Sequence, residues 1–190
     1  MFTLDLAQLT PEQRAMVELW ESHLDAEFDS KDAVASCGTM TEAPYVNHVP
    51  TLTGGLGREQ LLHFYSNYFI PHMPSDMETE LISRTVGQNR IVDEFVSRCT
   101  HTVQMDWLLP GVPATGRRLE IVLVVIVTFE EGKMSSEHIH WDQASVLVQA
   151  GLIDPANLPV SGAEAARKML DRNSVPSNLL IKRTIADDLL

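Results

Sequence analysis

The sequence predicts an α+β domain in which helices come first and a curved antiparallel sheet follows. Up to residue 70 the apolar residues recur every three or four positions, and from residue 78 they follow the shorter period of strands. Glu131-Gly132-Lys133 is a tight turn between two β-rich stretches, which indicates a hairpin. A bent sheet with helices across one end encloses a cavity, so we expect a small-molecule pocket there.

Length and charge narrow the possible organisation and partners. The 190 residues suit one domain, residues 1–153, followed by a C-terminal extension, residues 154–190, with a short helix and a polar tail. Hydrophobic residues make up 44% of the chain, enough for a core. The net charge of −12 repels a phosphate backbone, and Arg117-Arg118 is too small a basic patch to offset it. We expect no nucleic-acid partner.

Cysteine usage and the apolar runs indicate a cytoplasmic protein. Cys37 and Cys99 have no CxxC spacing, so they favour a reducing compartment and core positions. Residues 1–5 lack the basic start of a secretory signal. The longest apolar run, residues 121–127, is far shorter than the roughly 20 residues of a membrane span. We therefore expect no membrane partner.

The first part of the chain predicts three helices separated by a loop-rich stretch. Thr10-Pro11-Glu12-Gln13 has a cap, a proline at the first helical position and a capping-box glutamine. A short helix follows over residues 31–37. Prolines and the Gly54-Gly55-Leu56-Gly57 cluster predict loops over residues 43–57. Helical spacing returns over residues 58–70 and closes at Pro71.

The second part predicts strands. Residues 78–86 form one, and residues 91–107 form a long strand that bends around a barrel, with a bulge. Residues 119–129 are apolar on both faces, which indicates cover by helices, a pocket or a partner subunit. Residues 134–141 then run antiparallel beside them.

Two helices complete the expected order. One covers residues 144–150 and stops at Gly151, and the other starts by a capping box at Ser161-Gly162-Ala163-Glu164.

Polar side chains concentrate at the end of the last strand, Glu137-His138-Ile139-His140-Trp141-Asp142. Alternation places His138, His140 and Asp142 on one face and the other three residues on the opposite face. We interpret the first face as the working face of the pocket, with Asp142 as proton acceptor and the histidines as its catalytic partners. Helix capping alone also explains an aspartate at this position, and the two roles can coexist.

Other side chains are candidates for binding the substrate rather than for catalysis. Tyr45 and His48 lie in a stretch suited to the mouth of the cavity, where surface polarity is the alternative. Glu94 shares its parity with Arg98, so a structural ion pair is as good an interpretation as a substrate contact. The substrate-binding candidates are Tyr45, His48, Glu94, His101 and Trp141.

A metal-dependent enzyme is a third possibility. His138 and His140 are spaced to ligate a metal, with Glu94, Asp142 or His48 completing the set. The preferred interpretation needs no cofactor and no metal. The chain has no G-x-S-x-G or G-x-C-x-G elbow, so nothing supports an activated nucleophile. The glycine cluster matches neither a P-loop nor a dinucleotide fingerprint.

Several runs in residues 12–153 resemble the SnoaL-like polyketide cyclases of the NTF2-like superfamily. The similar segments are Pro113-Ala114-Thr115-Gly116-Arg117-Arg118-Leu119-Glu120, Val127-Thr128-Phe129-Glu130-Glu131-Gly132-Lys133-Met134, Glu137-His138, Trp141-Asp142, and Leu147, Gln149 and Gly151. Val46-Asn47-His48-Val49-Pro50 and Arg84-Thr85-Val86-Gly87 resemble a subgroup sometimes labelled dienelactone-hydrolase-associated. The resemblance implies a cone-shaped barrel with a pocket closed by N-terminal helices.

The resemblance also implies an activity. In the cyclases an aspartate before the Leu-Gln-Gly helix is the general acid and base of an aldol closure that uses no cofactor, and Asp142 matches it by its spacing to Gln149 and Gly151. His138 departs from the tryptophan commonly found there. Some relatives in the superfamily isomerise ketosteroids, some catalyse dehydrations, and some hydrolyse epoxides. Others have no activity and only bind a ligand. Members commonly form homodimers through the sheet.

The sequence thus predicts a cofactor-free lyase, isomerase or cyclase that acts by acid–base chemistry on a small apolar carbonyl or lactone compound. The alternative is a ligand-binding or interaction module without activity. A homodimer through the sheet fits the two-sided apolarity of residues 119–129.

Overall fold

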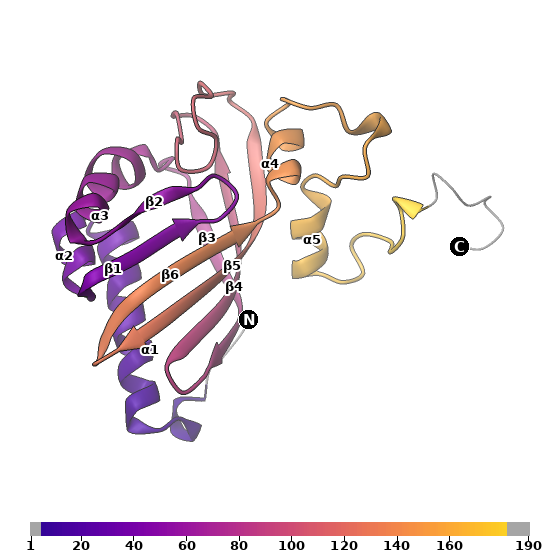
Figure 1. The fold of residues 1–190 in the computed structure, drawn as a ribbon. Helices are drawn as coiled ribbons and strands as arrows, with labels where there is room; N and C mark the ends of the chain where they lie inside the picture. The colour runs from indigo at the N-terminus through magenta and orange to yellow at the C-terminus, as the bar shows by residue number, and fades with distance from the viewer. Residues whose placement is uncertain (1–4, 182–190) are drawn as a thin grey trace.

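A computed structural model describes residues 5–181, which form one open, curved sheet with helices on both sides (Figure 1). The six strands follow the order β2-β1-β6-β5-β4-β3, and all neighbours are antiparallel except the parallel pair β1 and β6. The strands are β1 (Met40–His48), β2 (Thr53–Leu56), β3 (Glu78–Val86), β4 (Arg90–Thr100), β5 (Arg118–Glu130) and β6 (Lys133–Trp141).

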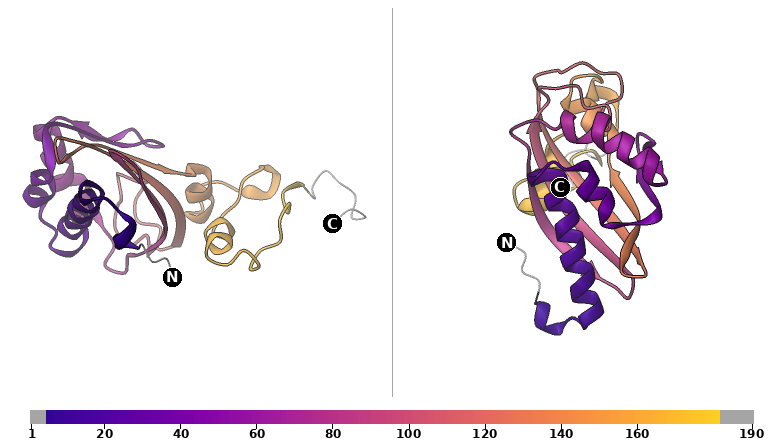
Figure 2. Two further views of the ribbon diagram at one scale, coloured as in Figure 1. Left: turned by 90° about the horizontal axis from the view of Figure 1, so that it is seen from below. Right: turned by 90° about the vertical axis from the view of Figure 1, so that its left-hand side faces the viewer.

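The sheet curves around the N-terminal helices, and the C-terminal helices lie on its other side (Figure 2). Among the described residues, no helix combines the length and apolar character needed to cross a bilayer. The helices and helical turns are η1 (Leu6–Gln8), α1 (Pro11–Leu24), η2 (Asp25–Asp29), α2 (Ala33–Gly38), α3 (Arg58–Phe64), η3 (Tyr65–Phe69), η4 (Ile70–His72), α4 (Gln143–Gln149), η5 (Pro155–Asn157) and α5 (Glu164–Leu170).

The start of α1 confirms the predicted capping box. The Thr10 hydroxyl accepts a hydrogen bond from the Gln13 N–H, and the Gln13 side chain accepts one from the Thr10 N–H. The helix buries Met16, Val17, Trp20 and His23 on one face. Its inner face is therefore apolar at first and becomes ionisable in the last turn.

Residues 43–57 hold no helix, as expected, but they are less loop-rich than predicted, because β1 and β2 occupy most of the stretch and only residues 49–52 form a turn between them. Pro44 is tolerated because it falls in the break between Met40 and Tyr45 where β1 does not pair with β6. At Gly54, with φ of +130°, a Cβ atom would stand 2.1 Å from the Val46 carbonyl oxygen. This glycine permits a close approach of two strands rather than a loop.

The strand expected over residues 91–107 is shorter than predicted, since β4 ends at Thr100. The following segment, residues 101–117, is a loop that buries Met105, Trp107, Leu108 and Leu109. Its side chains close one end of the core, which explains why its sequence is as apolar as a strand.

The later elements match the prediction except at one cap. Strands β3, β5 and β6 and helix α4 agree with their expected ranges to within a residue. Helix α5 begins at Glu164 with Ala163 as its cap, so the expected capping box at Ser161 is wrong. Instead the Glu164 carboxylate accepts a hydrogen bond from the Gly162 N–H.

The boundary at residue 153 stays a prediction. The part of the extension that the structure describes packs α5 against β5, where Arg167 pairs with Glu120. Residues 1–4, and residues 182–190 of the expected extension, lie outside the described part of the chain. The homodimer through the outer face of the sheet, where Val122, Val124 and Ile126 are half-buried, also stays a prediction.

A buried polar network fastens α1 to β3 and β4. Arg84 donates two hydrogen bonds to Asp93, at 2.9 and 2.8 Å, and the Trp20 indole donates a third to the same carboxylate at 2.8 Å. Asp93 is fully buried, so these donors offset the cost of removing its charge from water. The network fixes Trp20, whose ring stacks on His23 with centroids 5.6 Å apart.

Replacing Asp93 by alanine should lower the free energy of unfolding by about 3–5 kcal/mol, because buried Arg84 loses two hydrogen bonds and keeps only the exposed Glu21 as its partner. The Trp20 indole also loses its acceptor. Urea denaturation measures the change. Glu80→Ala is the matched control, since the Glu80–Arg98 pair is partly exposed and its loss should cost about 0–1 kcal/mol. Equal losses in the two variants would contradict the role of the network.

Candidate active site

The concave face of the sheet and the N-terminal helices enclose a cavity of about 470 Å³. Its walls are largely apolar and aromatic, with Leu24, Phe28, Phe69, Phe95, Trp107 and Ile139 among them. His48, Tyr65, Glu27 and Glu137 also line it. The cavity thus combines an apolar interior with a few buried polar groups, as small-molecule sites do.

Strand β6 presents to the cavity the face opposite to the one predicted. The alternation itself is as expected, but Glu137 and Ile139 are the residues that are buried and line the cavity. His138 lies on the outer face beside the ring of Tyr45, with centroids 5.4 Å apart. His140 is exposed. The placement of His138, His140 and Asp142 in the pocket is therefore wrong, and their catalytic role stays a prediction without a contact that supports it.

Asp142 has the capping role that the sequence left open. Its carboxylate accepts hydrogen bonds from the N–H groups of Ala144 and Ser145, at 2.9 and 3.2 Å, at the start of α4. The side chain is exposed, so it lies outside the cavity.

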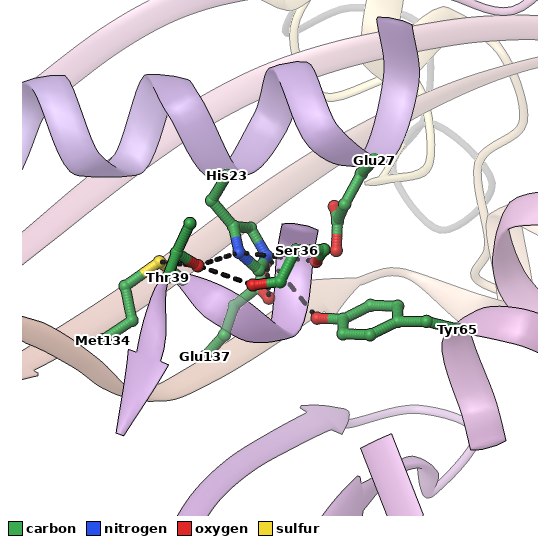
Figure 3. Close-up of polar contacts among 7 residues, drawn as sticks. All are labelled: His23, Glu27, Ser36, Thr39, Tyr65, Met134 and Glu137. Carbon is green, nitrogen blue, oxygen red and sulfur yellow. Dashed lines mark hydrogen bonds and ion pairs between the residues drawn. The ribbon is translucent and has the colours of Figure 1, made fainter. Parts of the chain in front are cut away.

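Figure 3 shows four buried side chains from separate elements that point toward one another. Glu27, Tyr65 and Glu137 line the cavity, and His23 lies behind them. His23 Nε2 lies 3.1 Å from Glu27 Oε1 and 3.8 Å from Glu137 Oε2. The Tyr65 hydroxyl is 3.5 Å from the same nitrogen. We call His23, Glu27, Tyr65 and Glu137 the acid–base cluster.

The local sequence explains how the cluster is assembled. His23 and Glu27 continue the inner face of α1 at the helical spacing set by Met16 and Trp20. Glu27 lies in the π-helical turn η2, and Tyr65 begins the second π-helical turn, η3. Such turns are frequent at functional sites, because the extra residue changes which way side chains point. Glu137 comes from the middle of β6.

Burial shifts the proton affinities of the cluster. Burial raises the pKa of Glu137 to about 8, the Glu27 carboxylate adds to the rise, and His23 opposes it. Burial lowers the pKa of His23, but the Glu27 and Glu137 carboxylates outweigh it, so the pKa is raised overall. Burial also raises the pKa of Tyr65 well above its ordinary value. At neutral pH the cluster therefore holds a His23–Glu27 ion pair beside a protonated Glu137 and a neutral phenol.

The same residues are the set that comes nearest to a metal site within residues 5–181. One ligand atom from each of His23, Glu27 and Glu137 lies within 4.8 Å of the others. In this arrangement the 3.1 Å contact between His23 Nε2 and Glu27 is a hydrogen bond. The expected His138–His140 site is not assembled in the described part of the chain.

The structure separates the predicted substrate-binding residues. His48 lines the cavity among the rings of Phe64, Phe69 and Trp107, and burial lowers its pKa to about 4, so it is neutral. The Trp141 ring lies 5.8 Å from His48, and its indole donates to Gln143. His48 lines the cavity, whereas Trp141 packs behind it and does not.

The other three candidates lie elsewhere. Glu94 accepts a hydrogen bond from Ser83, and Arg98 pairs with Glu80, so the expected Glu94–Arg98 ion pair is wrong. His101 contacts the Thr115 hydroxyl at 3.0 Å and holds the loop after β4. Tyr45 is exposed on the outer face. None of these three side chains lines the cavity.

Cys37 and Cys99 are buried free thiols, as expected for core residues. Burial raises the pKa of both, that of Cys99 to about 11, so neither is an activated nucleophile.

The sequence interpretation missed His23, Glu27 and Tyr65 as candidate site residues and placed Glu137 on the face away from the pocket. A signal for the first two was present: ionisable residues at i and i+4 on the apolar face of a helix must be buried together. For Tyr65 no signal distinguishes it from an ordinary core aromatic residue.

Comparison with solved structures identifies the fold of this chain. A putative SnoaL-like polyketide cyclase from Jannaschia sp. CCS1 superposes with a TM-score of 0.62 at 18% identity, over 77% of this chain and 99% of the other. TsrD from Streptomyces laurentii gives 0.59 at 18% identity, over 80% and 100%. An NTF2-like protein from Burkholderia pseudomallei K96243 gives 0.55 at 17% identity, over 74% and 98%. This chain has the NTF2-like fold.

The likeness lies in the structure. No protein-family model matches the sequence, and no curated protein matches it. The NTF2-like fold and the cone-shaped sheet that the sequence predicted are confirmed.

Stability should fall as pH rises from 6.5 to 8.0, because the folded chain keeps a proton on Glu137 that the unfolded chain has already lost. The contribution is complete below the unfolded pKa of 4.5 and is lost as pH rises through about 8. The slope from Glu137 is at most about 1.4 kcal/mol per pH unit. Urea denaturation at several pH values measures it.

Glu137→Gln should flatten this slope, since the amide has no proton to lose. Because the Glu137 carboxylate helps to raise the pKa of His23, the difference between the two proteins contains the loss of the Glu137 proton and the smaller change in His23. Parallel pH profiles for the two proteins would show that Glu137 is ionised in the folded chain at neutral pH.

Proposed function

We propose that this NTF2-like protein catalyses proton transfer next to a carbonyl group of an uncharged, largely apolar compound, as an isomerase, lyase or cyclase does. The observation that carries the proposal is a protonated carboxyl, Glu137, beside a histidine-paired carboxylate, Glu27, at an apolar cavity. Two carboxyl groups in different protonation states provide an acid and a base at one pH.

The geometry supports a division of roles. Glu137 donates its proton to the carbonyl oxygen, and the Tyr65 hydroxyl hydrogen-bonds the same oxygen as negative charge develops on it. Glu27 accepts the proton from the neighbouring carbon, whose electron pair forms the new C=C bond of an enol. Return of a proton to a different carbon isomerises the substrate, and attack of the enol carbon on a second carbonyl closes a ring.

The surroundings favour these roles. Glu27 and Glu137 oxygens lie within 4.8 Å of each other, close enough to serve neighbouring atoms of one substrate. His23 hydrogen-bonds the Glu27 carboxylate at 3.1 Å, and the apolar walls exclude water that would otherwise solvate the developing charge. The chemistry requires no cofactor.

Structural neighbours add a fold-level analogy to this proposal. The similar structures include a putative polyketide cyclase from Bacillus cereus ATCC 10987 (TM-score 0.57, 17% identity) and AclR, a putative hydroxylase from Streptomyces galilaeus (TM-score 0.55, 17% identity). At this identity the analogy concerns the kind of cavity, and the reaction rests on the cluster.

Deuterium exchange tests the proposal without knowledge of the natural substrate. The probe is 1-tetralone, a neutral bicyclic ketone with exchangeable protons beside its carbonyl. In D₂O the protein should accelerate loss of the α-proton signal in ¹H NMR. Glu137→Gln should reduce the accelerated rate by about 100-fold or more, because the amide cannot give a proton to the oxygen.

Glu18→Gln, on the exposed face of α1, is the matched control and should exchange at the rate of the unsubstituted protein. Asp142→Asn separates this proposal from the sequence prediction, and asparagine preserves the cap of α4. A loss of exchange in Asp142→Asn but not in Glu137→Gln would place the reaction at Asp142 instead. Binding of 1-tetralone without exchange would favour a binding module and contradict catalysis.

A further inference from the structure

On the side of His23 that faces away from Glu27, Nδ1 contacts two hydroxyl groups, that of Thr39 and, at a longer 3.5 Å, that of Ser36. His23 Nδ1 lies 2.7 Å from the Thr39 hydroxyl oxygen, and both side chains are buried. The same hydroxyl lies 2.7 Å from the Ser36 carbonyl oxygen, to which it donates. Figure 3 shows the hydroxyl between the ring and the end of α2.

These two contacts determine where the Nδ1 proton is. A hydroxyl has one hydrogen, and a carbonyl oxygen can only accept, so the Thr39 hydrogen belongs to the Ser36 contact. The alternative acceptor, the Met134 sulfur, is farther away at 3.8 Å. The Thr39 oxygen is then the acceptor in its contact with His23, and Nδ1 carries a hydrogen.

The backbone fixes Thr39 in this orientation. The Thr39 N–H donates to the Ser36 carbonyl at 3.2 Å, and its own carbonyl accepts from the Met134 N–H at 3.2 Å. Thr39 therefore connects the end of α2 to β6, the strand that carries Glu137. The hydrogen bonds from Ser36 through Thr39 to His23 are therefore attached to the sheet that forms the site.

With Nδ1 protonated, only Nε2 remains to respond to the cavity. Nε2 faces Glu27 at 3.1 Å, and the Glu27 and Glu137 carboxylates outweigh burial and raise the pKa of His23, which favours a second hydrogen on Nε2 and a cationic ring. The ionisable groups that act on the cluster, or on which its charges act, are Glu27, Tyr65 and Glu137 within it and Cys37 and His48 beside it. Burial raises the pKa of Glu137 to about 8, so this carboxyl can exchange a proton near neutral pH.

We propose that Thr39 is a positioning residue: by accepting the Nδ1 hydrogen it keeps His23 a cation and leaves the exchangeable proton of the site to Glu137. This inference deepens the proposed function and rests on it for its catalytic consequence, but the state of His23 is measurable without any substrate.

Thr39→Val tests the role, because valine has the same shape without the hydroxyl. The cation would then keep only the Ser36 hydroxyl oxygen, at a longer 3.5 Å from Nδ1, as a possible acceptor, so the pKa of His23 should fall by about one to two units. Loss of the cation should raise the pKa of Glu137 further, since His23 now lowers it. Long-range ¹H–¹⁵N NMR spectra of the imidazole report the protonation of each nitrogen.

Thr39→Ser is the matched control, since it restores the hydroxyl, and it should keep the spectrum and titration of the unsubstituted protein. Unchanged His23 titration in Thr39→Val, or a serine variant that behaves like valine, would overturn the inference. The unsubstituted protein gives a second check that needs no folded variant: its Nδ1 must be protonated from pH 6 to 8.

The two proposals fail in different ways. If Glu137→Gln exchanges 1-tetralone protons normally while Thr39→Val shifts His23 as stated, the proposed reaction is wrong and the positioning of His23 holds. If Thr39→Val leaves His23 unchanged while Glu137→Gln stops exchange, the reaction holds and the role of Thr39 is wrong.

Discussion

The hydrogen-bonded ion pair between His23 and Glu27 is the interaction on which the site depends. Both residues are buried, and a second carboxyl, Glu137, lies beside them. Two carboxylates and one imidazolium would leave a net negative charge in an apolar interior, which is costly. The least expensive arrangement adds one proton, and Glu137 takes it. A constraint on buried charge thus produces a carboxylic acid at neutral pH, which is what acid catalysis requires.

The rest of the fold holds this pair in place. Trp20 covers one face of the His23 ring and is itself fixed by Asp93 and Arg84, from β4 and β3. Thr39 holds the far nitrogen from the end of α2. The N-terminal helix is therefore bound to the sheet by polar contacts as well as by its apolar face, and both sets of contacts converge on His23.

Much of the fold could be predicted from the sequence, because local chemistry determines it. The Thr10 capping box and the turn at Glu131-Gly132 act within a few residues. The errors have one cause: tertiary contacts gave ordinary patterns another role. Gly54 predicted a loop, but it permits the close pairing of two strands. The loop after β4 was predicted to be a strand because it is apolar, and it is apolar because its side chains close the core.

The candidate site was harder to predict for a physical reason. Alternation along β6 separates two faces, but it does not indicate which face the helices cover. The sequence pattern favours the face with three polar residues, His138, His140 and Asp142, over the face that carries Glu137. The deciding fact is that His23 and Glu27 meet Glu137 across more than a hundred residues of sequence. Only the tertiary fold brings them together, and burial then makes their charges matter.

The central claim is that Glu137 keeps its proton at neutral pH. A ¹³C NMR titration of glutamate side-chain carboxyls, with the Glu137 signal assigned by its absence in Glu137→Gln, measures this directly. The account predicts one carboxyl that titrates near the raised pKa of about 8. Complete ionisation of every glutamate below pH 6 would contradict it.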